Sequence, residues 1–149
     1  MNKMCIEDLL NCPYWIIDVL PKQVPAESAG QYFTVEKYFR TVLMEQIQLR
    51  KLLLILKLCC YRAITLFFPD TEESAKNPPP EVLRESMNNR NVCLIIGDAL
   101  ITSDPEDTGM TLYNASDELI DLMEKLALSE SFYVWQTEEG INREGRKNR

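Results

Sequence analysis

The sequence predicts an α+β fold over residues 1–149 as a single domain, with one mixed β-sheet and about three helices packed on it. The chain of 149 residues is long enough to form one well-packed core. Its apolar fraction (46%) and charged fraction (26%) are near globular averages, which argues against a disordered or fibrous chain. Short β-branched and aromatic runs alternate with segments of helical periodicity, and this alternation predicts helices packed on a sheet.

The first third of the chain predicts a strand and then a long helix. The run from Tyr14 to Leu20 lies between prolines and is rich in β-branched and aromatic residues, so we expect a short strand there. Residues 21–30 contain two prolines and a glycine, which predict a loop. From Thr34 onward apolar residues recur with a helical period, and this predicts a long, largely buried helix near residues 33–60.

This predicted helix changes character along its length. Its first half has a polar side, but after Lys51 leucine and isoleucine occupy that side as well. A helix that is apolar all round has to be covered all round, either by the rest of the chain or by a partner. A buried strand over residues 52–58 is a further interpretation. The interface candidates are three apolar residues and the narrow polar edge that remains beside them: Leu52, Ile55, Leu58, Gln46, Arg50 and Lys57.

Four aromatic residues gather in the first half of the same helix: Tyr32, Phe33, Tyr38 and Phe39. Aromatic side chains can stack on a ligand or on nucleic-acid bases. At helical spacing they are more typical of a protein core, and we expect them to be core residues.

The most apolar stretch of the chain, residues 51–68, argues against a membrane span. Its longest unbroken apolar run extends only from Leu52 to Leu56, whereas a spanning helix needs about 20 mostly apolar residues. Lys57 and Arg62 also fall inside this stretch, and a charge at the bilayer centre costs about 2.5–3.5 kcal/mol. We therefore expect no membrane partner.

The second half of the chain predicts two further helices and several strands. Residues 69–80 form an acidic, proline-rich connector, and a polar tail begins at about residue 138. Two apolar runs around residues 97–98 indicate a hairpin or one bulged strand. The expected strands are at residues 61–68, 110–114 and 132–137. The expected helices are at residues 81–87, with Pro80 in the first turn, and at residues 115–131, with Ser116 as N-cap.

Charge is unevenly distributed along the sequence. The formal net charge is −7, and residues 63–131 hold fourteen acidic side chains against four basic ones. Such a surface repels phosphate groups, because affinity for nucleic acid comes largely from lysine and arginine. The expected partner is therefore not nucleic acid but a protein, either a basic one or a second copy of this chain.

The five cysteines indicate a reducing compartment. Their number is odd, and no two of them have the C-x-x-C spacing. Three lie in apolar surroundings, where a free cysteine behaves as a small hydrophobic residue. The first ten residues contain no long apolar run typical of a signal peptide. We expect a cytoplasmic protein.

The sequence offers few side chains for catalysis. It contains no histidine, which removes Ser-His-Asp and Cys-His catalysis, and no glycine-rich phosphate loop, so we expect no cofactor. Asp104, Glu106 and Asp107 place three carboxylates within four residues, and they are candidate ligands for Ca²⁺ or Mg²⁺. Asp18 and Asp98 follow or interrupt apolar runs and are further carboxylate candidates. Solvated turns and helix caps explain the same residues.

Two classes of function remain after these exclusions. The first is a small, acidic, non-catalytic protein-interaction module of the inhibitor, immunity or regulatory-subunit type. The alternative is an enzyme that uses carboxylates and a divalent cation. We expect the first, because the chain offers an apolar helix and an acidic surface but few catalytic groups.

Overall fold

The fold is built on one seven-stranded sheet with the strand order β3-β2-β4-β5-β6-β1-β7. The computed structural model describes residues 5–143, apart from the side chains of residues 28–30. The predicted α+β class, with helices packed on a sheet, is confirmed. The described strands pair in antiparallel fashion and not in a mixed sheet. Short connections explain this for β2–β3, β4–β5 and β5–β6, because parallel neighbours require long crossovers.

The elements have the following bounds. The strands are β1 Tyr14–Asp18, β2 Thr65–Phe67, β3 Ser74–Lys76, β4 Val92–Ile96, β5 Ala99–Ser103, β6 Met110–Tyr113 and β7 Tyr133–Trp135. The helices are α1 Ile6–Leu9, the short 3-10 helix η1 Ala26–Ser28, α2 Ala29–Thr41, α3 Met44–Cys59, α4 Pro80–Asn89, α5 Asp117–Ser129 and α6 Glu138–Asn142.

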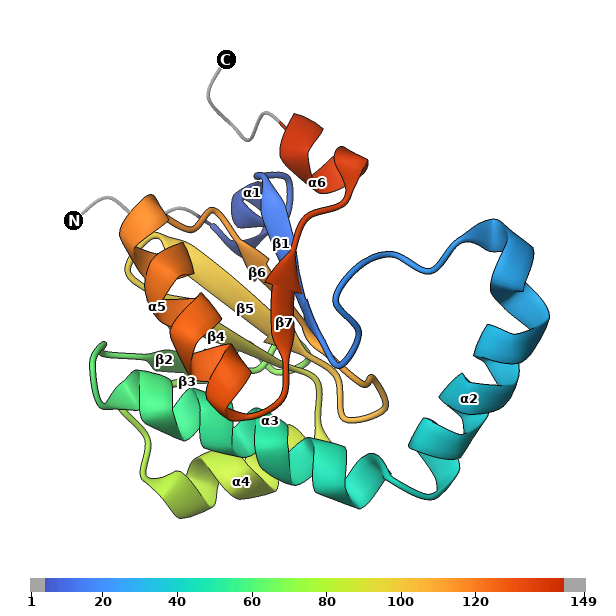
Figure 1. The fold of residues 1–149 in the computed structure, drawn as a ribbon. Helices are drawn as coiled ribbons and strands as arrows, with labels where there is room; N and C mark the ends of the chain where they lie inside the picture. The colour runs from blue at the N-terminus through green and yellow to red at the C-terminus, as the bar shows by residue number, and fades with distance from the viewer. Residues whose placement is uncertain (1–4, 144–149) are drawn as a thin grey trace.

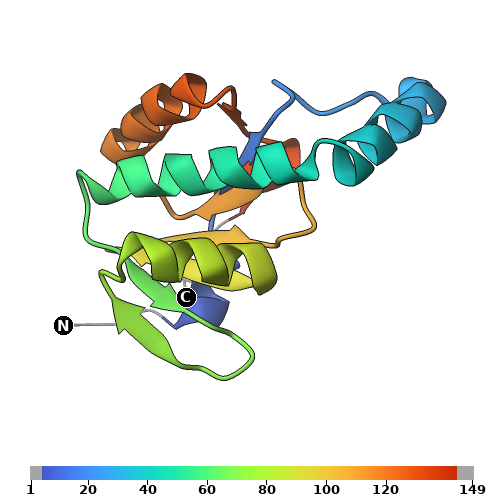
Figure 2. The ribbon, with the colours of Figure 1, turned by 90° about the horizontal axis from the view of Figure 1, so that it is seen from below.

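Three helices cover one face of the sheet. α3 lies between α4 and α5 and contacts both (Figures 1 and 2). Beneath them, Leu66 lies opposite Leu94, Leu94 opposite Ile101, and Ile101 opposite Leu112. All four side chains are fully buried, and burying each contributes about 1.5–3 kcal/mol. Because side chains alternate along a strand, this row fixes which residues point to the other face.

The other face of the sheet carries a second row of paired residues, which we call the outer row. Cys93 lies opposite Thr102, Thr102 opposite Thr111, and Thr111 opposite Ile16. α1 packs on part of this face, where its residue Leu9 is buried against β4 and β5. The remainder of the outer row lines a cavity that is described below.

The long helix predicted near residues 33–60 is in fact two helices. α2 ends at Thr41 and α3 begins at Met44, with Leu43 at φ −105° and ψ 3° and no side chain capping the new helix. Neither glycine nor proline lies at this break, so the usual sequence signals are missing. After the break α3 packs on the sheet, whereas α2 contacts the core only near its end, through Phe39. Figure 1 shows that α3 lies along the sheet while α2 projects away from it.

Several local predictions are confirmed in the second half. β4 and β5 form a hairpin around Gly97 and Asp98, and Gly97 has a φ of +59°, a conformation that glycine adopts without steric cost. Pro80 begins α4. The Ser116 hydroxyl accepts a hydrogen bond from the Leu119 N–H at 3.2 Å and caps α5.

Two segments expected to be irregular contain regular structure. The connector over residues 69–80 includes β3, which pairs with β2 and forms one edge of the sheet. The tail expected from residue 138 begins with α6, whose N-cap Thr137 accepts a hydrogen bond from the Gly140 N–H at 2.9 Å. The rest of that tail, residues 144–149, lies outside the described part of the chain.

Candidate interaction surface around α2 and the loop after β5

The three apolar interface candidates of α3 belong to the core of the same chain. Leu52 is 5% exposed, and Ile55 and Leu58 are fully buried. The sheet lies on one side of α3 while α4 and α5 flank it, which explains why this helix is apolar almost all round. The prediction that these residues wait for a partner is therefore corrected, because the chain covers them itself. Within residues 5–143, no helix combines the length and hydrophobicity needed to cross a bilayer.

The polar edge of α3 is not gathered into one surface. Lys57 Nζ lies 2.6 Å from Glu130 Oε2 and 3.0 Å from Ser129 Oγ, so it joins α3 to the end of α5. Gln46 and Arg50 are exposed nearer the start of α3. Lys57 therefore contributes to the contact between two helices, whereas Gln46 and Arg50 face solvent.

Unpaired apolar side chains are found instead on α2. Val35 and Tyr38 are 39% and 55% exposed, and Val42, in the turn that follows Thr41, is 54% exposed. The Val42 N–H continues the helical hydrogen bonding to the Tyr38 carbonyl at 2.8 Å, so the i, i+3, i+7 spacing places the three on one side. We call these three residues the α2 stripe. Phe39 packs against the core, as predicted for the aromatic cluster, but Phe33 (61% exposed) and Tyr38 do not, because α2 projects from the body (Figure 1).

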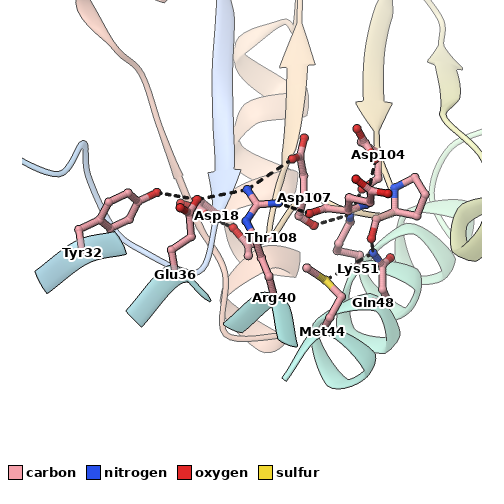
Figure 3. Close-up of polar contacts among 12 residues, drawn as sticks. Asp18, Tyr32, Glu36, Arg40, Met44, Gln48, Lys51, Asp104, Asp107 and Thr108 are labelled. Carbon is pink, nitrogen blue, oxygen red and sulfur yellow. Dashed lines mark hydrogen bonds and ion pairs between the residues drawn. The ribbon is translucent and has the colours of Figure 1, made fainter. Parts of the chain in front are cut away.

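The loop between β5 and β6, residues 104–109, accepts hydrogen bonds from side chains of α3. We call it the acidic loop. Fully buried Lys51 donates from Nζ to the Asp104 carbonyl at 2.9 Å and to the Asp107 carbonyl at 3.0 Å (Figure 3). Gln48 donates to the Pro105 carbonyl in the same way. Burial lowers the pKa of Lys51 to about 8, although the charges of Asp107 and Asp104 oppose this shift. The chain therefore supplies its own cation to the carbonyls of this loop.

Arg40 ties α2 to the acidic loop from the side. Its guanidinium lies 3.2 Å from Glu36 Oε2 and 3.8 Å from Asp107 Oδ1, and it donates to the Glu106 carbonyl (Figure 3). The Tyr32 hydroxyl donates to the same Glu36 carboxylate at 3.1 Å. Partial burial, and then this hydrogen bond, raise the pKa of Tyr32. Tyr32, Glu36 and Arg40 thus form a continuous series of polar contacts along the side of α2 that faces the acidic loop.

Asp18, at the end of β1, lies beside the acidic loop. Its Oδ1 accepts a hydrogen bond from the Thr108 hydroxyl at 3.1 Å. Burial raises the pKa of the Asp18 carboxyl, and the charge of Glu36 adds to this shift. The close approach depends on Gly109, because a Cβ at that position would collide with the Ile17 carbonyl.

The predicted carboxylates are only partly brought together. Asp18 and the acidic loop are adjacent, but Asp98 lies in the hairpin turn at the opposite end of β5. In the part of the chain that the structure describes, no three carboxylate or thiol side chains are placed so that they could hold a metal ion. The Asp104 carboxylate is used locally, because its Oδ1 accepts the Glu106 N–H at 2.9 Å.

A cavity of about 460 Å³ adjoins this cluster on the outer face of the sheet. Its floor is the outer row, and Ile6 of α1 and the C-cap residue Leu10 form an apolar wall. Asp18, Asp104 and Asp107 lie at its other end, together with Arg40. Sequence reasoning found the carboxylates but missed the cavity, because the cavity needs β1 and α1, from the start of the chain, beside the consecutive strands β4, β5 and β6. The alternation within each strand was the only available signal.

Comparison with known proteins adds no relative. No family model matches the chain, and no curated protein or solved structure matches it significantly.

Proposed function

We propose that this protein is a non-catalytic protein-interaction module, of the inhibitor, immunity or regulatory-subunit type, that docks a basic partner protein on α2. The observation that carries the proposal is the α2 stripe. A helix that projects from its own body with Val35, Tyr38 and Val42 exposed offers an anchor that the fold itself does not use. Exposed contiguous apolar side chains with a polar surround are typical of protein-binding surfaces.

The charge of the whole molecule favours a basic partner. A stable interface buries about 800 Å² on each protein, which is more than three side chains provide, so a partner on the stripe also has to contact neighbouring residues. The exposed Glu106 and Asp107 of the acidic loop contact α2 through Arg40, which lies on roughly the opposite side of the helix from the stripe. The net charge of −7 extends the same sign over the molecule, and it would steer a basic protein toward this surface.

The proposal also places the protein in the cytoplasm. All five cysteines are free thiols, and free thiols are typical of reducing compartments. Burial raises the pKa of the Cys59 and Cys93 thiols, which keeps them in the less reactive protonated form.

The test compares two glutamate substitutions at equally exposed apolar positions. Tyr38→Glu disrupts the stripe, while Leu128→Glu on α5 (67% exposed in the wild type) is the matched control. Each variant is immobilised and exposed to a lysate of the source cells, and the captured protein is purified and titrated by calorimetry. Both substitutions should change the free energy of unfolding by no more than about 0.5 kcal/mol, because neither side chain is packed.

We expect the wild type and Leu128→Glu to capture the same basic protein, and Tyr38→Glu to bind it at least tenfold more weakly. The affinity should also fall as salt rises, since part of the attraction is between exposed charges. The proposal fails if nothing is captured, if all three forms capture a protein equally, or if the captured protein is acidic. It also fails if light scattering shows a dimer that Tyr38→Glu dissociates, because the stripe then binds a second copy.

A further inference from the structure

The cavity on the outer face has two ends of different chemistry. Ile6 of α1 and its C-cap residue Leu10 give one end an apolar lining, and Ile16 adds to the apolar part of the floor. Asp18 and the acidic loop give the other end its carboxylates. Its volume of about 460 Å³ lies in the range of 300–1,000 Å³ typical of ligand sites. A molecule that fills it needs an apolar stem and a polar head.

The polar end has an excess of negative charge. Arg40 lies there, but its guanidinium already interacts with Glu36 at 3.2 Å and with the Glu106 carbonyl. Lys51 lies beneath the loop and donates to main-chain carbonyls instead of carboxylates. The carboxylates of Asp18 and of the acidic loop therefore outnumber the cations beside them.

Asp18 is the carboxylate with the clearest need for a cation. Asp18 contacts the Thr108 hydroxyl and the backbone of residues 19 and 20, and the charge of Glu36 acts on it. Burial and this like charge both raise its pKa. A cation at the cavity end would relieve both effects, because an opposite charge within about 4–6 Å favours the ionised carboxylate.

We propose that the outer-face cavity receives a lysine or arginine side chain of the basic partner, with its aliphatic stem on the outer row and its cationic head beside Asp18. The choice of partner rests on the proposed function, but the chemistry of the site does not. Long basic side chains bury their methylene stems on apolar surface and keep the charged head in a polar environment. The cavity offers both surroundings, and Arg40 of α2 contributes to its lining.

The test uses short peptides, so that it does not depend on capturing the partner. The protein is titrated with acetyl-Leu-Lys-Leu-amide and with acetyl-Leu-norleucine-Leu-amide, in which norleucine keeps the stem and removes the charge. Free n-butylammonium is the third probe. Binding is followed by amide chemical shifts of the ¹⁵N-labelled protein. Asp18→Asn removes the charge at the site, and Asp98→Asn makes the same change in the hairpin turn at the opposite end of β5.

We expect the lysine peptide to shift amides of the outer row and the acidic loop, and to bind at least fivefold more tightly than the norleucine peptide. Asp18→Asn should abolish this preference, and Asp98→Asn should preserve it. Thr111→Phe, which fills the floor of the cavity, should weaken both peptides and serves as a second variant if Asp18→Asn is poorly folded. Tyr38→Glu should bind the peptides normally, so that failure of the α2 proposal is distinguishable from failure of this one.

Three results would overturn the inference. One is equal binding of the lysine and norleucine peptides, and another is a set of shifts outside the cavity. The third is n-butylammonium binding as tightly as the lysine peptide, because the site would then suit a free amine and not a side chain presented by a protein.

Discussion

Lys51 is the only charged side chain among residues 5–143 that is fully buried. Its two hydrogen bonds to the carbonyls of Asp104 and Asp107 explain why it is tolerated there, since a buried cation needs compensating acceptors. In the sequence, Lys51 belongs to the polar side of a helix, and that pattern predicts exposure. The carbonyls that receive it are more than fifty residues away, so the pattern of its own helix carried no sign of its burial.

The buried lysine predicts a specific dependence of stability on pH. The folded-state pKa of Lys51 is about 8, while the unfolded value is about 10.4. Between these values the unfolded state holds a proton that the folded state has lost, so raising the pH stabilises the folded state through this group. Below pH 8 both states are protonated and the contribution is constant. Relative to Lys51→Met, the wild type should therefore gain up to about 3 kcal/mol between pH 7 and pH 10.5.

Urea unfolding of both proteins at intervals of half a pH unit, under reducing conditions, measures this difference. Cysteine and tyrosine titrations affect both proteins alike and cancel in the comparison. Parallel stability curves for the wild type and Lys51→Met across pH 8–10 would contradict the assigned environment of Lys51.

Among the elements, α2 departs most from what the sequence indicated. The helical period was correctly read, and Phe39 packs as expected. The break before α3 and the exposure of the stripe were not foreseen, because neither glycine nor proline marks the position. What directs α2 is contact with distant residues, chiefly the interaction of Arg40 with the acidic loop. Periodicity identifies the apolar side of a helix but not whether the fold covers it.

The interaction of Arg40 with the acidic loop predicts how firmly α2 is attached to the body. Arg40→Gln should leave α2 helical but loosen its attachment, because the charged donor to the Glu106 carbonyl and the contact with Asp107 are lost. We expect amides of α2 to exchange with deuterium on the order of fivefold faster, corresponding to about 1 kcal/mol. Amides of the central strands should be unchanged.

Hydrogen-exchange mass spectrometry gives this measurement directly. Arg84→Gln is the matched control, since Arg84 pairs only locally with Glu81 on the surface of α4. Exchange in α2 that is identical in the wild type and Arg40→Gln would show that apolar packing alone positions the helix.

In the whole molecule, the sheet interleaves the two halves of the chain. β2, from before the connector, pairs with β4 from after it, and β1 lies between β6 and β7. The core cluster likewise combines residues from both halves, such as Leu54 with Leu94 and Met123. The connector over residues 69–80 is therefore not a spacer, because its strand β3 extends the same sheet.

The interleaved sheet predicts cooperative unfolding. The single domain expected over residues 1–149 should melt in one transition, with equal calorimetric and van't Hoff enthalpies. Separating the halves would break the β1–β6, β1–β7 and β2–β4 pairs and divide the shared core, which is why partial unfolding should not be populated. Differential scanning calorimetry under reducing conditions tests this, and two resolved transitions would show that the halves are separate units.

The sequence alone determined the fold class, the cap at Ser116 and the position of most strands, and at Gly97 it narrowed the choice to a hairpin or one bulged strand. These features depend on interactions within a few residues, which composition and periodicity record. Only the tertiary structure decided that Leu52, Ile55 and Leu58 are core while Tyr38 is exposed, and that Asp18 meets the acidic loop beside a cavity. Those outcomes depend on which distant segments pack together, and a local pattern of apolar and polar residues does not specify the neighbour.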